Sequence, residues 1–405
     1  MNKKLVLVSI LCFLGYMMYS VDRMVMSSSV GLISDDFSLT SGQSGLLLSA
    51  FFYGFICFLF IGGIFSDRLS SKWVLIIGVV LFSVFSGLTG FAIGLVSIVI
   101  YRVLTGIGEG VFWPSASHEI AKVTTEKQRT TVMSLYWAGY PIGGFFGTWL
   151  GAVLGPTFGW QAVFFATGII GLVIALLYAI LVKSNKNNES ATSDDEENVP
   201  LRTLFKYRSI IVMSIYYFVL LSSWWIVLLW APTLLQQTKG MELGLAGTIA
   251  SLSGISGAIG GYVIGRYCDL GSLYRRKSVL IFITIISAFL MAAVVLDTPT
   301  WLTAVFIFLL GFFGYPITPV VLAVTTHLVP KKITGSALGL VTNVGMIAGG
   351  VSPWLLGVLS EYYSMSSIWL VASFVMLISM ILLFFIGKLE HVNKEKENPS
   401  KEVAL

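Results

Sequence analysis

The chain has 405 residues, of which 56% are hydrophobic and only 11% are charged, whereas a soluble protein carries charge on about a quarter of its residues. This composition excludes a soluble globular domain and indicates a polytopic membrane protein. The apolar runs reach about 20 residues without alternating in period two, so we expect helical spans and not the strands of a barrel. The net charge of +5 does not indicate a nucleic-acid partner, and the expected surroundings are the lipid bilayer.

Twelve apolar segments predict twelve transmembrane helices in an all-α protein. They lie near residues 5–28, 44–65, 74–93, 95–116, 130–153, 161–182, 209–231, 244–265, 278–296, 300–328, 334–357 and 366–387. The first segment follows MNKK as a signal peptide does, but it lacks a small-residue cleavage site, so we expect it to be retained as a helix.

One loop is much longer than the others and contains the polar, acidic sequence NKNNESATSDDEENVP. Such a composition predicts a flexible linker. The linker divides the chain into two halves of six spans each. The expected units are a first half at 1–182, the linker at 183–208, a second half at 209–387 and a tail at 388–405.

Lysine and arginine gather on one side of the predicted helices. With the N-terminus inside, 22 of the 25 basic residues fall in inner segments, and such residues concentrate on the cytoplasmic side of membrane proteins. Lys239 falls in an outer loop, whereas Arg23 and Arg102 fall within apolar segments. We therefore expect both termini and the linker to be cytoplasmic, and the lack of a cleaved leader fits a bacterial inner membrane.

A short motif recurs at the same place in both predicted halves. A glycine, an aspartate four positions later and a cluster of bases follow the second span and again the eighth. Shared spacing of this kind indicates an internal repeat of six spans, because positive-inside charges alone do not require it. The motif residues are Gly63, Asp67, Arg68 and Lys72 in the first half, and Gly265, Asp269 and Arg275 in the second.

Over its whole length the chain resembles the major facilitator superfamily. The repeated loop is similar to the superfamily's motif between spans two and three, where the aspartate and the bases are thought to brace the inward-closed gate. The resemblance implies that gating role for the motif residues. It also implies transport by alternating access, in which the two halves rock about a central site.

Three further stretches resemble the anion:cation symporters, a family with bacterial sugar-acid/proton symporters, sialic-acid carriers and vesicular glutamate carriers. They are VDR in span one, RVLTGIGEGVFWP in span four and WAPTLL in span seven. In that family the span-one arginine binds the substrate carboxylate, while the acid beside it and the span-four glutamate carry protons. The resemblance implies these roles for Arg23, Asp22 and Glu109, and a substrate contact for Asn343.

Three positions depart from that family's pattern. Ser20 stands where the family has a tyrosine, and in span two Phe55 and Leu59 stand where it has a tyrosine and a glutamine. Polar groups that would meet a hydroxylated substrate are therefore absent. The departures disfavour a polyhydroxy sugar acid and leave room for a smaller or more apolar organic anion.

Four charged residues lie within the apolar segments, where each costs about 2.5–3.5 kcal/mol on insertion scales. Arg102 and Glu109 are seven positions apart, so they share one face of span four. Asp22 and Arg23 are consecutive and point about 100° apart, so we expect their partners on another helix, and span four offers one of each sign. A count of about 1.5 Å per residue places Arg23 about 28 Å from Lys4, which leaves a surface ion pair at the membrane interface as the alternative.

The four charges suggest how an anion and a proton could be handled together. An arginine stays charged and presents a planar fork that matches a carboxylate. We hypothesise that protonation of Glu109 or Asp22 frees Arg23 or Arg102 to bind the substrate. Release of the substrate and the proton would then restore the internal pairs.

Several aromatic and histidine residues are weaker candidates, for which packing or an interfacial position is the alternative. Tyr140 is the preferred cavity-lining residue in SLYWAGYPIGG, and Tyr53 in span two is a further substrate-binding candidate. Tyr315 and Pro316 could form a kink or gate in span ten, since proline breaks the backbone ladder. The others are Tyr136, Trp137, Tyr216, Trp224, Trp225, His118 and His327.

The sequence contains no nucleophile–base constellation, phosphate loop or metal cluster, which argues against an enzyme and predicts no cofactor other than the proton as coupling ion. Cys12, Cys57 and Cys268 have neither metal-site nor disulfide spacing. The leading hypothesis is a monomeric transporter that imports a small organic anion, such as a carboxylate or sugar acid, with protons. Anion exchange and efflux are the alternatives within transport, and a substrate sensor that does not transport is an alternative from another class.

Overall fold

The computed structural model describes residues 3–182, 204–269, 273–330 and 333–397, so most of the predicted linker and the end of the tail lie outside the described residues. The described chain is helical, as lipid requires, because a helix satisfies its own backbone hydrogen bonds. The first half consists of α1 (Lys3–Phe37), α2 (Ser41–Arg68), α3 (Ser71–Thr89), α4 (Leu95–Val123), α5 (Glu126–Phe158) and α6 (Trp160–Leu181). The second half consists of α8 (Arg208–Lys239), α9 (Leu243–Asp269), α10 (Leu273–Val294), α11 (Thr300–Gly314), α12 (Ile317–Thr325), α13 (Thr334–Leu359) and α14 (Met365–Glu397).

The prediction of an all-α membrane fold is confirmed. Within the described ranges, eleven helical segments are long and apolar enough to cross a bilayer, with α11 and α12 together forming one of them. The twelfth expected span lies in α5, which carries glycines, tyrosines, tryptophans and two prolines and is not one of these eleven segments. The break between α11 and α12 falls at Tyr315 and Pro316, as expected where a proline interrupts the ladder.

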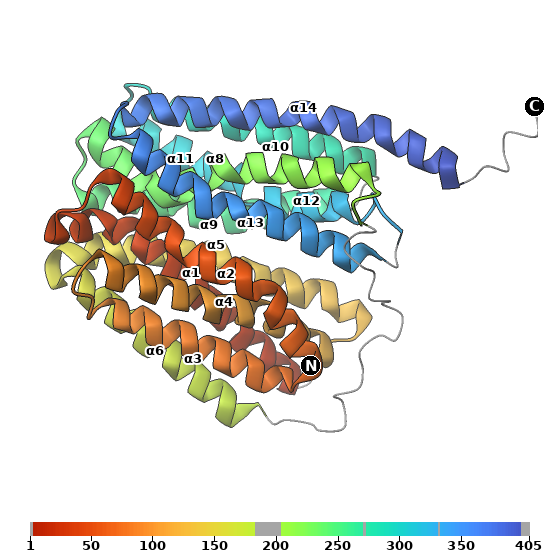
Figure 1. Ribbon diagram of the computed structural model, residues 1–405, viewed down its shortest axis with the longest axis horizontal. Helices are drawn as coiled ribbons and strands as arrows, with labels where there is room; N and C mark the ends of the chain where they lie inside the picture. Colours follow the sequence, from red (N-terminus) through yellow and green to blue (C-terminus); the bar gives the residue numbers. More distant parts are fainter. Residues whose placement is uncertain (1–2, 183–203, 270–272, 331–332, 398–405) are drawn as a thin grey trace, which may run out of the picture.

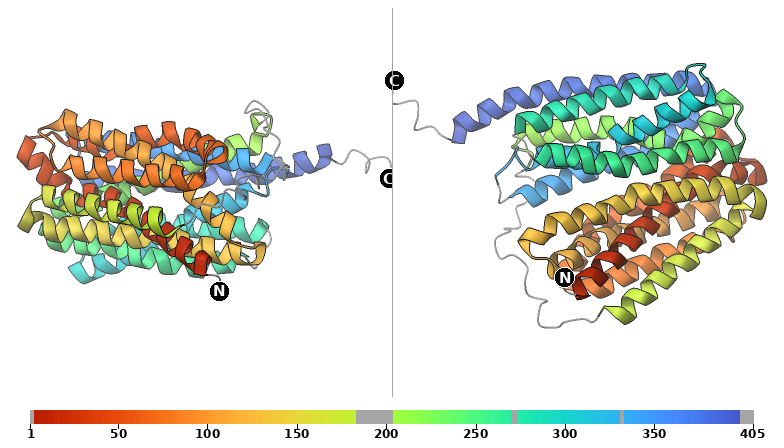
Figure 2. Two further views of the ribbon diagram at one scale, coloured as in Figure 1. Left: turned by 90° about the horizontal axis from the view of Figure 1, so that it is seen from below. Right: turned by 180° about the vertical axis from the view of Figure 1, so that it is seen from behind.

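The same packing pattern occurs in both halves. In the first half α1 packs on α5, α2 on α4, and α3 on α4 and α6; in the second half α8 packs on α13, α9 on α11, and α10 on α11 and α14. Figures 1 and 2 show the two halves as adjacent bundles. The bundle has two ends. The end at which α1 begins is called the basic end, and the opposite end, where α1 finishes and α2 begins, is called the far end.

The two halves meet along a seam in which α2 packs on α13 and α5 packs on α9. Backbones approach closely there because glycines line the contact. A Cβ atom at Gly357 of α13 would lie 2.3 Å from the carbonyl oxygen of Ser41, and one at Gly45 of α2 would lie 2.6 Å from that of Pro353. The far end of the seam therefore has no room for side chains at these positions.

Toward the basic end, the helices of the two halves are no longer in such close contact. On α9 a Cβ at Gly254 would lie 2.4 Å from the Pro141 carbonyl oxygen of α5, but one at Gly261 or Gly265 would meet nothing within 4 Å. The same is true of Gly339 on α13. The ribbons of the two halves diverge toward the basic end in Figure 1, so this is a conformation joined at the far end and parted at the basic end.

Hydrogen bonds cross the seam near the far end. The Ser27 hydroxyl of α1 donates to the Leu229 carbonyl of α8 at 2.8 Å, and the Trp354 backbone N–H donates to the Ser49 hydroxyl at 3.0 Å. The Glu361 carboxylate, just beyond α13, accepts a 2.8 Å bond from the Gly42 backbone N–H. Gly42 lies in the first turn of α2, where N–H groups lack helical partners and attract negative charge. Glu361 thus caps a helix of the opposite half.

We expect Gly357→Leu to open the far end. Overpacking of a close contact costs about 1–3 kcal/mol, and here only the joined conformation bears that cost. A cysteine at Ser49, which is buried, should then react faster with a maleimide, in a Cys57→Ser background because Cys57 is exposed. Gly339→Leu is the matched control, and equal labelling in both variants would contradict the seam assignment.

The Glu361 cap makes closure of the far end depend on pH. The Gly42 N–H, followed by the Thr40 side chain, holds the pKa of Glu361 below its ordinary value of 4.5. Because this pKa is lowered, the contact is fully present at a pH above the ordinary pKa. It is lost as the pH falls through the lowered pKa. The labelling rate of Ser49→Cys, relative to that of a small free thiol at the same pH, should therefore rise as pH falls below 4.5, and Glu361→Gln should remove that part of the rise. An unchanged pH profile in Glu361→Gln would show that Glu361 is not the group responsible.

Candidate functional site

The adjacent Asp22 and Arg23 of α1 lie inside the first half and not at its surface. Their exposed fractions are 2% and 1%. Both side chains form ion pairs with α4, as the signs along span four predict: Arg23 with Glu109 and Asp22 with Arg102. The alternative of a surface ion pair is therefore wrong, because both side chains are buried and paired between α1 and α4.

Arg23 holds one oxygen of Glu109. Its Nε donates to Glu109 Oε2 at 2.7 Å, and its Nη2 lies 2.6 Å from the same oxygen. Nη2 also donates to the Tyr19 hydroxyl one helical turn earlier on α1. Glu109 Oε1 is buried and has no hydrogen-bond partner. The carboxylate is thus bound through one oxygen, while the other is open to a proton or to a rearranged contact.

Asp22 is held more completely. Its Oδ2 accepts a 2.7 Å bond from Arg102 Nη1, and its Oδ1 accepts a bond from the Ser86 hydroxyl of α3. Arg102 is itself fully buried, and its Nε and Nη2 have no partner. This second pair therefore links α1, α3 and α4, with donor capacity left on Arg102.

The two pairs form one buried group of four charges that sums to zero. Glu109 lies within electrostatic range of Arg23, Asp22 and Arg102. Isolated charges in such a place carry a large desolvation cost, and a pair of opposite sign reduces it. A fifth charge brought into this group needs a compensating change, which a proton on a carboxylate can provide.

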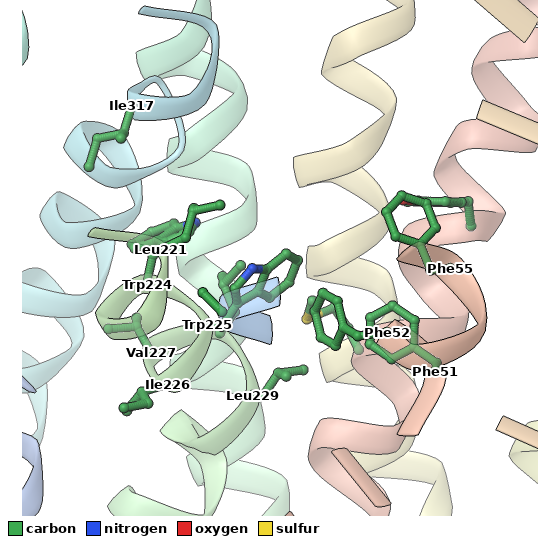
Figure 3. Packing of buried hydrophobic residues seen from close by; sticks show 14 of the residues in the cluster. Phe51, Phe52, Phe55, Leu221, Trp224, Trp225, Ile226, Val227, Leu229 and Ile317 are labelled. Atoms are coloured by element: carbon green, nitrogen blue, oxygen red, sulfur yellow. The ribbon is translucent and has the colours of Figure 1, made fainter. Parts of the chain in front are cut away.

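Aromatic rings surround the Arg23 guanidinium. Its central carbon lies 4.0 Å from the ring centre of Tyr19, 4.3 Å from Phe51, 4.8 Å from Phe55, 5.6 Å from Phe52 and 5.9 Å from Trp225. Such contacts attract a cation to the ring face. Figure 3 shows Trp225 of α8 directed toward Phe52 of α2 across the boundary between the halves, and their ring centres are 4.6 Å apart. The arginine therefore lies in the first half at the point where the second half contacts it.

The other predicted substrate-binding residues are placed differently from one another. Tyr140 lies in electrostatic range of Arg23, and its ring is 6.0 Å from that of Tyr19. Asn343 donates to the Gly339 carbonyl of its own helix at 2.9 Å, so its amide is not directed to Arg23 here. Tyr53 is 39% exposed, and its hydroxyl donates to the Gly350 carbonyl on the seam. The structure thus brings Tyr140 to the charged group and places Tyr53 on the seam.

The motif residues are described in part. Gly63 and Gly265 lie near the basic ends of α2 and α9, and the Lys72 ammonium donates to the Ala179 carbonyl in the last turn of α6 at 3.0 Å. The Arg275 guanidinium lies 5.1 Å from the ring centre of Tyr267. The side chains of Asp67, Arg68 and Asp269 lie outside the described residues, so bracing of a gate stays a prediction.

Among the weaker candidates, Tyr315 lies, like Trp225, at the boundary between the halves. Its ring centre is 6.2 Å from that of Tyr140 and 5.3 Å from that of Trp224. Tyr216 instead bonds Thr284 inside the second half. Tyr136 stacks on Tyr16, and Trp137 is edge-on to it. His118 contacts Ser66, and His327 contacts Arg276.

Sequence reasoning missed several residues of the site. Tyr19 precedes Arg23 by four positions, so helical spacing could have placed both on one face. Ser86 carries no motif, and Phe51 and Phe52 are indistinguishable from the lipid-facing phenylalanines of other spans. Which of these rings turns inward depends on the packing of α2 against α1 and α4.

The comparisons with known proteins agree with this architecture. The sequence profile of the Major Facilitator Superfamily matches residues 12–273 and 270–404. The hexuronate transporter of Bacillus subtilis is 28% identical over 85% of this chain and 85% of its own length. The probable sulfoacetate transporter SauU of Cupriavidus necator is 26% identical over 88% of this chain and 87% of its own. The structure of the nucleoside transporter NupG superposes with a TM-score of 0.77 at 16% identity, covering 96% of this chain and all of that chain.

We expect Asp22→Asn to destabilise the protein by about 3–5 kcal/mol, because removal of one partner leaves Arg102 buried and uncompensated. The double variant Asp22→Asn/Arg102→Met should recover most of that loss, since it removes both charges. Thermal unfolding of the purified proteins in detergent measures both effects. A double variant no more stable than Asp22→Asn alone would show that the pair does not carry the linkage between α1 and α4.

Proposed function

The chain belongs to the major facilitator superfamily of membrane transporters, and from this premise we propose that it carries a small organic anion together with a proton. The observation that carries the proposal is the buried ion pair between Arg23 and Glu109 at 2.6 Å. One partner is a fixed cation at the boundary between the halves. The other is an acid whose second oxygen is free of partners.

Arg23 supports an anionic substrate. It has the forked geometry that suits a carboxylate or a sulfonate, and Glu109 occupies that position now. The relatives named for hexuronate and sulfoacetate are transporters of molecules with one or both of these groups. We infer that the substrate's acidic group replaces Glu109 on Arg23.

Charge balance supports coupling to a proton. The four buried charges sum to zero, so a monovalent anion bound to Arg23 would leave the group with a net negative charge. Uptake of one proton by Glu109 restores neutrality and weakens its hold on Arg23. Binding of the anion and of the proton therefore favour each other, which is the thermodynamic requirement for symport.

Direction and location follow from the distribution of basic residues. If the basic end faces the cytoplasm, as the positive-inside rule predicts, the described conformation is closed outside and parted inside. Import would then proceed from an opposite conformation, in which the far end opens and Arg23 receives the anion with the proton. We propose a bacterial inner-membrane protein with both termini cytoplasmic, acting as a monomer and without a cofactor.

We expect Glu109→Gln to abolish accumulation driven by protons while sparing counterflow. Glutamine keeps the shape of the side chain but cannot take up a proton, and it leaves Arg23 free to bind the anion. The measurement is uptake of radiolabelled glucuronate, sulfoacetate and benzoate into proteoliposomes, with and without an inward proton gradient, beside substrate-loaded exchange.

The matched control is Glu119→Gln, which makes the same change on the same helix. Glu119 bonds Ser71 and Tyr178 and has no contact with Arg23, so the variant should retain accumulation. Proton-driven accumulation that persists in Glu109→Gln would disprove the role of Glu109. Exchange without any gradient-driven accumulation in the unmodified protein would favour an exchanger.

A further inference from the structure

Resting on the proposed anion transport, we propose that the substrate is an aromatic monocarboxylate: a planar ring that carries one acidic group and few other polar atoms. The proposal stands on the surroundings of Arg23. Any anion that reaches this guanidinium must place its body among the side chains that enclose it, and these are mostly aromatic rings.

The rings around Arg23 come from both halves of the protein. Tyr19 belongs to α1, Phe51, Phe52 and Phe55 to α2, and Trp225 to α8, all with ring centres within 5.9 Å of the guanidinium carbon. Offset or edge-on packing against such rings is worth more for an aromatic body than for an aliphatic one of equal area.

A row of aromatic rings continues from Tyr19 to Tyr140 of α5 and to Tyr315, which lies between α11 and α12. The ring centres of Tyr19 and Tyr140 are 6.0 Å apart, those of Tyr140 and Tyr315 are 6.2 Å apart, and those of Tyr315 and Trp224 are 5.3 Å apart. A ligand whose acid lies on Arg23 therefore has ring faces and edges on the side of Tyr140 and Tyr315 as well.

Few polar groups are available for a hydroxylated body. The Asn343 amide bonds its own helix, and the Tyr217 hydroxyl bonds Thr318. Among the described residues, the buried polar atoms beside Arg23 that lack a partner are Glu109 Oε1, Arg102 Nε and Nη2, and Trp225 Nε1. One acceptor and three donors suit a carboxylate and one substituent. The several hydroxyls of a sugar acid would lose water without finding partners.

The contact between Phe52 and Trp225 gives an aromatic ligand a further effect. These rings meet edge-on at 76°, one from each half, as Figure 3 shows. A ring that binds beside Arg23 can pack on both at once. Phe52 and Trp225 would then select the substrate by its ring, while Arg23 selects it by its charge.

The test compares three anions by isothermal titration of the purified full-length protein at constant pH. Benzoate has the ring and the carboxylate, cyclohexanecarboxylate has the same acid on an aliphatic ring, and glucuronate has hydroxyls instead. We expect benzoate to bind about tenfold more tightly than cyclohexanecarboxylate and more tightly still than glucuronate. Arg23→Ala should abolish binding of all three.

Variants then assign the preference to named rings. Phe52→Leu or Trp225→Leu should bring the ratio of benzoate to cyclohexanecarboxylate toward one, whereas Phe52→Tyr should keep it. Phe384→Leu is the matched control, because Phe384 is 65% exposed on α14. Two separate variants keep the assignment testable if one of them fails to fold, as judged by its thermal unfolding.

The outcomes separate this inference from the proposed function. Binding of glucuronate or cyclohexanecarboxylate as tight as that of benzoate, and lost in Arg23→Ala, would overturn the aromatic preference and leave anion transport standing. Binding that persists in Arg23→Ala, or absence of binding by every anion, would overturn both. A benzoate preference unchanged in Phe52→Leu and Trp225→Leu would show that these rings do not recognise the substrate.

Discussion

A permanently charged arginine in the middle of a membrane bundle needs a counter-charge, and much of this structure follows from that need. Glu109 of α4 is the counter-charge of Arg23, and Asp22 is the counter-charge of Arg102. These two pairs join α1 to α4. They also leave Arg23 with a partner that can be exchanged, because a substrate carboxylate offers the same charge and geometry as Glu109.

The two pairs differ in how tightly each acid is held, and this difference favours one of them for proton coupling. Both oxygens of Asp22 accept hydrogen bonds, from Arg102 and from Ser86. Glu109 has one oxygen bound and one free. A proton on Asp22 would disrupt contacts among three helices, whereas a proton on Glu109 disrupts one. Asp22 therefore suits a positioning role and Glu109 suits the titrating one.

The fold could be predicted from the sequence because hydropathy and the side preference of bases act on each residue separately. The pairing of Asp22 and Arg23 with α4 could also be predicted, since few charges of the right sign lie in the membrane. The aromatic surroundings could not, because α2 is apolar on most of its faces and only packing turns Phe52 inward and Tyr53 to the seam. The sequence could not predict which end of the bundle is joined either, because one sequence can adopt two packings of its halves.

On α1 and α8, residues of the site lie one helical turn from a hydrogen-bonded contact between the halves, which suggests how binding reaches the far end. On α1, Ser27 follows Arg23 by four residues and donates to the carbonyls of Leu228 and Leu229. On α8, those leucines follow Trp225 by three and four residues. A ligand that separates Trp225 from Phe52 therefore acts on the same turn of α8 that Ser27 holds. Because the Ser27 bonds join the halves, a change in the contacts of Trp225 bears directly on whether the far end stays joined.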